Sequence, residues 1–422
     1  MAETESSQKP GMSGVRNYAI VSAAYWGFTL TDGALRMLVL LHFHTLGYSP
    51  FQLASLFMLY EIMGVVTNLV GGWLASQHGL KIMLNTGLGL QVAALITLSL
   101  LDPAWSLAWS ISYVLAVQGV SGVAKDLTKI SSKSAIKLVV PNNSHSTLFK
   151  WVAVLTGSKN ALKGVGFFLG GLLLSTMGFV LGLWLMAACL ALVLLASISL
   201  LPHDMSKGKS KTKVSALFSK SQAINLLSAA RVFLFGARDV WFAVGLPVFL
   251  VEVLDCSFAS VGAFLALWII GYGFVQGSAP IILKSSRDGR SSEVKAAQLW
   301  VFILTGLTMM VASAIHAGYQ PAWTLIIGLG VFGFCFAINS AVHSYLILAF
   351  SKSNDVAQSV GFYYSANAAG RLAGTLLSGI AYQWQGLAGC LGVAAGMLVL
   401  ACVFTVALGA TKQIRPGQVA TD

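Results

Sequence analysis

Six basic side chains lie within long apolar stretches of this 422-residue chain: Arg36, Lys159, Lys163, Arg231, Arg238 and Arg371. Only three acidic residues, Asp32, Glu61 and Asp239, are comparably placed. An ionised side chain surrounded by hydrocarbon is energetically expensive, so each of these groups must face a partner or a wet interior. Because three acids cannot neutralise six cations, the surplus predicts an internal site for an anion that carries more than one charge.

Lys159 and Lys163 are four residues apart and therefore share one face of a helix. Their ammonium groups repel each other unless something negative binds there. Guanidinium groups hold phosphate-like oxyanions through paired hydrogen bonds, and lysine adds a compact charge. The residues predicted to bind substrate are Arg36, Lys159, Asn160, Lys163, Arg238, Asn367 and Arg371.

A structural ion network is the alternative, with some side chains reaching toward the membrane surface. For Arg231 both interpretations stay open.

The three acids are candidates for proton coupling or gating, because a buried carboxylate can change its protonation near neutral pH. Glu61 has no cation nearby in sequence. Asp32 and Arg36 are four residues apart, so they either pair on their own helix or face the substrate. Arg238 and Asp239 are neighbours, and we expect their side chains to point in different directions.

Four further lysines, Lys125, Lys129, Lys133 and Lys137, recur at every fourth position. This spacing is typical of one helix face, and we expect a helix that extends out of the membrane on the cytoplasmic side, where it fixes the topology. Lys125 and Lys129 are candidates for a second role, which is to attract anions to a cytoplasmic entry.

The composition indicates which elements position these residues. Only 9% of the residues are charged and 56% are hydrophobic, whereas soluble domains carry roughly a quarter charged residues. An ordinary soluble enzyme, a disordered chain and a disulfide scaffold are excluded. A membrane-spanning helix needs about 20 apolar residues. The apolar runs predict twelve spans, at 18–44, 51–75, 82–101, 105–124, 149–174, 180–200, 223–251, 258–283, 296–316, 322–349, 356–382 and 387–410.

The distribution of charge predicts the orientation. Twenty of the 26 lysines and arginines fall in the termini and in the loops of one face, and the opposite loops contain none. Lysine and arginine are retained on the cytoplasmic side during insertion, so we expect both termini there. The first residues lack the features of a signal peptide. The five cysteines are isolated, so the sequence predicts no metal site, no disulfide and no cofactor.

The two halves of the chain resemble each other. A shift of 207 residues superimposes Asp32 on Asp239 and also Asn160 on Asn367. The predicted organisation is a cytoplasmic tail (1–17), a six-helix bundle (18–200), a basic cytoplasmic linker (201–221), a second six-helix bundle (222–410) and a cytoplasmic tail (411–422). Two parallel repeats of six helices are typical of major facilitators.

The loop at 72–81 supports this interpretation, because Gly72, Gly79 and Lys81 fit the major facilitator pattern G-x-x-x-D-R-x-G-R-K. Ser76 replaces its acidic residue, which puts the gating salt bridge attributed to that acid in doubt, and Leu80 replaces a basic one. The expected fold is an all-α integral membrane protein with twelve transmembrane helices in two pseudo-symmetric six-helix bundles.

Three blocks of sequence resemble a more specific family. They are AYWGFTLTDGALRMLVLLHFH at 24–44, SGVAKDLTK at 121–129 and LTGSKNALKG at 155–164. They are similar to blocks of the ArsJ family of organoarsenical efflux permeases. Together with the twelve-span plan, the resemblance covers nearly the whole chain.

The resemblance implies export of 1-arseno-3-phosphoglycerate across the bacterial inner (plasma) membrane. Glyceraldehyde-3-phosphate dehydrogenase is then the functional partner, because it forms this compound when arsenate replaces phosphate. The compound decomposes outside the cell, so export confers arsenate resistance. Its two anionic groups suit a cationic site, and pentavalent arsenic in an oxyanion needs no thiolate ligand.

Three alternatives are weighed against this function. A major facilitator for another organophosphate or organic anion would use the same cations. An intramembrane enzyme acting on a phosphorylated lipid would need a nucleophile and base or a metal cluster, and the sequence offers neither. A drug:proton antiporter is disfavoured by the surplus of cations and by the lack of a proline among the glycines of the fifth span.

Overall fold

The apolar runs of the sequence form long helices, because a backbone in hydrocarbon must satisfy its own hydrogen bonds. The computed structural model describes residues 12–135, 145–202, 221–282, 291–351 and 356–411. Within these residues the structure is helical, with connecting turns and no strand. Residues 1–11 and 412–422 of the predicted tails and most of the predicted linker lie outside the described residues, and 12–17 of the first predicted tail already belong to the first helix.

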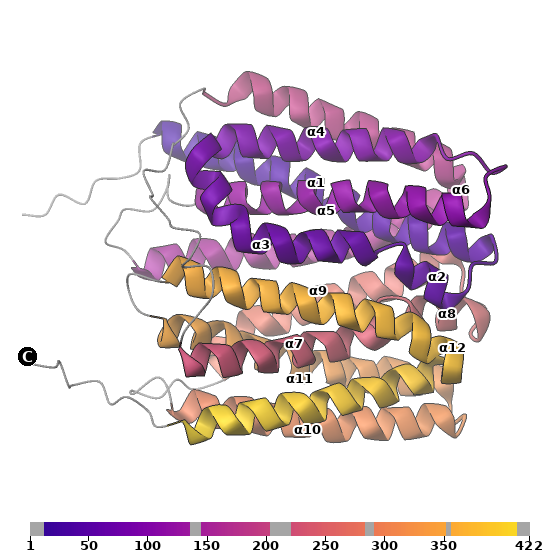
Figure 1. Cartoon of the computed structure of the whole chain (residues 1–422), viewed down its shortest axis with the longest axis vertical. Helices are drawn as coiled ribbons and strands as arrows, with labels where there is room; N and C mark the ends of the chain where they lie inside the picture. Colours follow the sequence, from indigo (N-terminus) through magenta and orange to yellow (C-terminus); the bar gives the residue numbers. More distant parts are fainter. Residues whose placement is uncertain (1–11, 136–144, 203–220, 283–290, 352–355, 412–422) are drawn as a thin grey trace, which may run out of the picture.

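The helices run side by side along one direction, and those before residue 203 lie mainly above those after residue 220 in Figure 1. The first half contains α1 (Met12–Thr45), α2 (Pro50–Ser55), α3 (Met58–His78), α4 (Leu80–Ser99), α5 (Leu107–Ala135) and α6 (His145–Leu200). The second half contains α7 (Gln222–Phe242), α8 (Gly245–Glu252), α9 (Phe258–Ile282), α10 (Ser291–His316), α11 (Pro321–Phe350) and α12 (Val356–Ala410).

The two longest helices are interrupted where the sequence predicts a turn between spans. Gly178 has φ 77° in α6, and Gly386 has φ 58° in α12. Glycine adopts positive φ without a steric penalty. Nine segments of the described residues are long and apolar enough to cross a membrane, with each interrupted helix counted once. The all-helical membrane architecture is therefore confirmed, and the number of twelve spans stays a prediction.

In each half, glycines allow the first helix to pack closely against another helix that carries charged residues. These pairs are α1 with α6 and α7 with α12. A Cβ added to Gly33 of α1 would lie 2.7 Å from the carbonyl oxygen of Lys163 in α6. In the second half, a Cβ on Gly374 of α12 would collide with the backbone of Gly236 in α7. These contacts place the charged residues of α1 beside those of α6, and those of α7 beside those of α12.

The two halves also pack directly against each other. A Cβ added to Gly262 of α9 would lie 2.6 Å from the carbonyl oxygen of Phe167 in α6. One added to Gly379 of α12 would lie 2.5 Å from the carbonyl oxygen of Pro50. The interface between the halves is therefore formed by the contacts of α6 with α9 and of α12 with α2 and α3, and the charged residues lie along it.

The lysine run after the fourth predicted span differs from expectation in one respect. The helix does continue past the predicted end at residue 124, because α5 extends to Ala135. However, Lys125 and Lys129 point into the protein, where Lys125 Nζ lies 3.9 Å from the ring centroid of Tyr60. The physical reason is that α5 packs against α3 along this face, so its lysines find partners there.

Lys81, which the sequence places in a loop, lies in the first turn of α4 and has a structural role within the first half. Its Nζ donates hydrogen bonds to the carbonyl oxygens of Ile198, at 3.0 Å, and Leu201. The last carbonyls of a helix have no partner within it, so a lysine there satisfies them and complements the helix dipole. The side chains of residues 71–78 lie outside the description.

Candidate functional site

Glu61 of α3 joins charged residues from both halves. Its side chain is fully buried, and its Oε1 accepts a hydrogen bond from Arg36 Nη1 of α1 at 3.1 Å. Its Oε2 accepts from Arg371 Nη2 of α12. Glu61 has no cation nearby in sequence, and both of its partners come from other helices. One carboxylate links an arginine of each half.

Asp239 of α7 forms the second centre of ion pairing. It accepts a hydrogen bond from the adjacent Arg238, whose Nε lies 2.6 Å from Asp239 Oδ1. Arg371 Nε lies 3.8 Å from Asp239 Oδ2. The expectation that Arg238 and Asp239 point in different directions is wrong, because the long arginine side chain folds back to its neighbour. Arg371 thus lies between two carboxylates.

Asp32 of α1 does not form an ion pair with Arg36. The hydroxyl of Tyr60 donates to Asp32 Oδ1 at 2.7 Å, while Arg36 pairs with Glu61 instead. Tyr60 is 4% exposed and lies next to Glu61 in α3. The sequence analysis did not single out Tyr60, although its place beside a buried acid was a usable signal.

Lys159 and Lys163 of α6 have no carboxylate within 4.0 Å among the described residues. The Nζ of Lys163 lies 5.6 Å from the ring centroid of Phe167, and Asp32 is the nearby acid whose charge acts on it. The charges of Lys163, Lys133 and Lys129 all act on Lys159. The predicted lysine pair is thus brought close to further cations without a carboxylate in contact.

Asn160 and Asn367, the two asparagines related by the internal repeat, belong to one chain of polar contacts. Asn160 Nδ2 lies 3.5 Å from Gln276 Oε1 of α9, and Gln276 Nε2 lies 3.4 Å from Ser340 Oγ of α11. Arg231 of α7 donates to Ser340 Oγ at 3.1 Å and to Asn367 Oδ1 at 3.1 Å. These contacts form a second connection between the halves, beside the one through Glu61.

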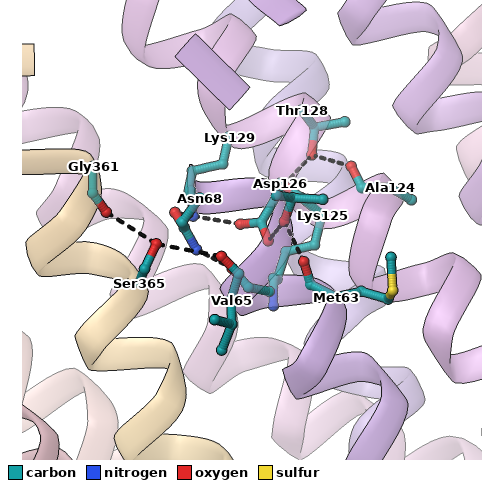
Figure 2. A network of polar contacts seen from close by, with 12 residues as sticks. Met63, Val65, Asn68, Ala124, Lys125, Asp126, Thr128, Lys129, Gly361 and Ser365 are labelled. Atoms are coloured by element: carbon teal, nitrogen blue, oxygen red, sulfur yellow. Dashed lines mark hydrogen bonds and ion pairs between the residues drawn. The ribbon is translucent and has the colours of Figure 1, made fainter. Parts of the chain in front are cut away.

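Lys129 belongs to a polar network at the cytoplasmic end of the predicted topology (Figure 2). It forms an ion pair with the buried carboxylate of Asp126 and donates to Asn68 Oδ1 at 2.7 Å. Ser365 of α12 reaches this region and donates to the carbonyl oxygen of Val65 at 3.3 Å. Asp126 is an interior acid that the sequence analysis missed, because it stands between two lysines of an expected surface face.

The exposed fractions of the charged side chains indicate what the site offers to a ligand. Glu61 is 0% and Asp239 5% exposed, whereas Arg36, Arg238 and Arg371 are 11%, 18% and 19% exposed. The carboxylates are therefore inaccessible, whereas the three arginines keep a small accessible surface. Such an arrangement can bind an anion but offers little to a cation.

Comparison with known proteins identifies the architecture. The family model for the Major Facilitator Superfamily matches residues 18–291. The chain belongs to the major facilitator superfamily. No curated protein matches the sequence.

Two solved structures are similar in fold. One is a bacterial homologue of the iron transporter ferroportin in an inward-facing state, with a TM-score of 0.70 and 14% identity, covering 94% of this chain and 99% of that one. The other is a POT family transporter in complex with a thioalcohol-conjugated peptide, with a TM-score of 0.70 and 14% identity, covering 93% and 95%. At this identity the likeness concerns the fold alone. The family model shows that the chain is a multi-pass membrane transporter.

In major facilitators the substrate site lies at the interface of the two repeats. The candidate residues here come from α1, α3 and α6 of the first half and from α7 and α12 of the second. By contrast, a cavity of about 200 Å³ between α1 and the end of α6 is lined by apolar and small side chains, including Ile20, Val193 and Leu200. It lies away from the charged cluster and lacks the chemistry to bind an anion.

Proposed function

We propose that this major facilitator exports 1-arseno-3-phosphoglycerate from the cytoplasm by alternating access. The observation that carries the proposal is the lysine pair of α6, Lys159 and Lys163, which lies at the interface of the halves without a carboxylate in contact. Polyvalent oxyanions are the ligands that such a surplus of cations favours. The resemblance of three sequence blocks to organoarsenical permeases specifies the substrate within that class.

In the proposed mechanism, the ion pairs couple substrate binding to the movement of the two halves. Glu61 holds Arg371 of the other half, and an oxyanion that reaches Arg371 competes with this carboxylate. Binding then weakens one of the contacts that hold the halves together. A ligand shifts a conformational equilibrium only through a difference in its affinity for the two states, and this competition supplies one.

The remaining candidates have subordinate roles in this scheme. Lys125 and Lys129 attract the substrate at the cytoplasmic entry, and Arg36, Arg238, Asn160 and Asn367 complete the binding surface. Glu61 and Asp239 act in gating, and Asp32 is the remaining candidate for proton coupling. We also propose that the protein lies in the bacterial inner membrane with both termini cytoplasmic, and that glyceraldehyde-3-phosphate dehydrogenase supplies the substrate.

A transport assay in everted membrane vesicles tests this function, because export from the cell becomes uptake into the vesicle. Dehydrogenase, glyceraldehyde 3-phosphate, NAD and arsenate outside the vesicles generate the unstable substrate continuously. We expect arsenic to accumulate inside only when the transporter and the complete dehydrogenase mixture are both present. Arsenic uptake that does not depend on the dehydrogenase would refute the assignment of the substrate.

The lysine pair is tested in the same assay with Lys159→Gln and Lys163→Gln. Each variant should lower the initial uptake rate by about tenfold or more, because a charge-assisted contact is worth about 1.5–3 kcal/mol. Lys295→Gln, on the exposed surface of α10, is the matched control and should transport normally. If both α6 variants fold and transport at normal rates, the site is elsewhere.

Another organophosphate or organic anion remains the alternative substrate, since the same cations would bind it. Excess 3-phosphoglycerate or glycerol 3-phosphate separates the two cases. Uptake of either compound at the rate of the arsenical would favour the broader organophosphate carrier.

A further inference from the structure

Arg231 is a buried cation that the site described above does not account for. It is 4% exposed, and no carboxylate of the described residues lies within 4.0 Å of it. Instead, its guanidinium carbon lies 3.8 Å from the ring centroid of Phe235 and 5.0 Å from that of Tyr363. Aromatic faces stabilise a cation, but they do not neutralise its charge.

The helix that carries Ser340, a hydrogen-bond partner of Arg231, holds two buried polar side chains with unused hydrogen-bonding capacity. Asn339 and His343 of α11 are 0% and 1% exposed, and neither the amide atoms nor the ring nitrogens have a partner among the described residues. The charge of Arg231 acts on His343. Buried polar groups without partners are rare in native proteins and call for a ligand, a water or a functional reason.

Asn367 of α12 adds hydrogen-bond donors beside Arg231. Its Oδ1 accepts from Arg231 Nε at 3.1 Å, so its amide N–H groups are left as donors. Arg371 lies four residues further along α12 and therefore on the same helix face. Arg231 thus orients the Asn367 amide so that its N–H donors lie on the same face of α12 as the Arg371 guanidinium. Hydrogen-bond donors and positive charge together are what an oxyanion requires.

We propose that Arg231, Asn367 and Ser340 form a second anion subsite, so that the carrier holds ligands with two anionic ends. This rests on the proposed function, in which the lysine pair binds the first end. The two subsites are joined by Asn160, Gln276 and Ser340 through contacts of 3.5 and 3.4 Å. Such long hydrogen bonds are weak and are readily exchanged for contacts with a ligand. The ligand class is a short organic anion with a phosphate-like group at one end and a second oxyanion at the other.

Binding to the purified protein in lipid nanodiscs tests the second subsite with two stable probes. 3-Phosphoglycerate has a phosphate and a carboxylate, whereas glycerol 3-phosphate has only the phosphate. We expect the wild-type protein to bind 3-phosphoglycerate about tenfold more tightly or better, the value of one charge-assisted contact. Arg231→Gln should abolish this preference by weakening only the two-ended probe.

Two further variants make the result specific. Arg16→Gln, on the exposed start of α1, is the matched loss of an arginine and should keep the preference. Arg231→Lys keeps the interior charge and so protects folding, but it lacks the planar guanidinium and should reduce the preference at least about threefold. A variant of Arg231 that folds and keeps the full preference, or that weakens both probes equally, would overturn the second subsite.

The vesicle assay distinguishes failure of the second subsite from failure of the proposed function. If the wild-type protein takes up the arsenical in the vesicle assay but binds neither probe, or binds both with equal affinity, the second subsite is rejected and the function stands. If it binds both probes and loses them in Lys159→Gln, while Arg231→Gln changes nothing, the function stands and the second subsite alone is wrong.

Discussion

Replacing Glu61 with glutamine probes the connection between the halves. Glu61→Gln retains the shape of the side chain but removes a charge that is 0% exposed and contacts two arginines. Arg371 keeps Asp239 at 3.8 Å, whereas Arg36 has no other carboxylate within 4.0 Å among the described residues. Leaving one buried charge unpaired costs about 3–5 kcal/mol. We expect this loss in the free energy of unfolding, measured with sodium dodecyl sulfate in mixed micelles by tryptophan fluorescence.

A double-mutant cycle identifies the cause of that loss. Adding Arg36→Gln to Glu61→Gln removes the orphaned charge, so the double variant should be more stable than the sum of the single changes predicts, by about 0.5–3 kcal/mol. Glu252→Gln is the matched control, because Glu252 is 46% exposed and its contact with His44 spans 3.9 Å; it should lose less than about 1 kcal/mol. Additive effects of the two substitutions would refute the assignment of Glu61 as the paired centre.

Three other predictions use the same unfolding measurement. Gly33→Ala places a Cβ 2.7 Å from the carbonyl oxygen of Lys163 and should lower the free energy of unfolding by about 1–3 kcal/mol. The control is Gly157→Ala, whose Cβ would have nothing within 4 Å and which should be neutral or stabilise by up to about 1 kcal/mol. Equal effects of the two substitutions would refute the close approach of α1 and α6. Lys81→Met removes the donor to the last carbonyls of α6 and should cost about 1–2 kcal/mol, so an unchanged stability would show that water replaces it. Tyr60→Phe removes the hydroxyl that contacts the buried aspartate of α1 and should cost about 1–3 kcal/mol; no loss would indicate that this carboxylate has another donor.

The sequence was sufficient to predict the helical membrane fold and the group of interior charges, because both follow from the price of exposing polar groups to hydrocarbon. It was insufficient to predict which charges pair. Spacing along one helix offered Asp32 as one possible partner of Arg36. Arg36 instead pairs with Glu61, 25 residues away, and Glu61 also pairs with Arg371, 310 residues away. Such partners depend on how helices face each other, and no local pattern encodes that.

The lysine run of α5 shows the same limitation of local sequence patterns. A face with a lysine at every fourth position is typical of a solvent-exposed helix end, and the sequence analysis assigned it so. In the structure this face contains Asp126, whose carboxylate is fully buried between Lys129 and Thr67. An acid placed three residues before a lysine permits such burial, because the pair enters the interior together.

The ion pairs also explain how the charged interface can open without leaving a buried charge unpaired. If the halves separate, Glu61 stays with Arg36 within the first half, and Arg371 stays with Asp239 and Arg238 within the second. The contact that breaks is therefore one that both partners can replace inside their own half. Had Glu61 been the sole partner of Arg371, opening would leave a buried guanidinium unpaired and the halves would be locked. The excess positive charge that remains on the second half after separation is then available to an anion, and this makes substrate binding and opening favour each other.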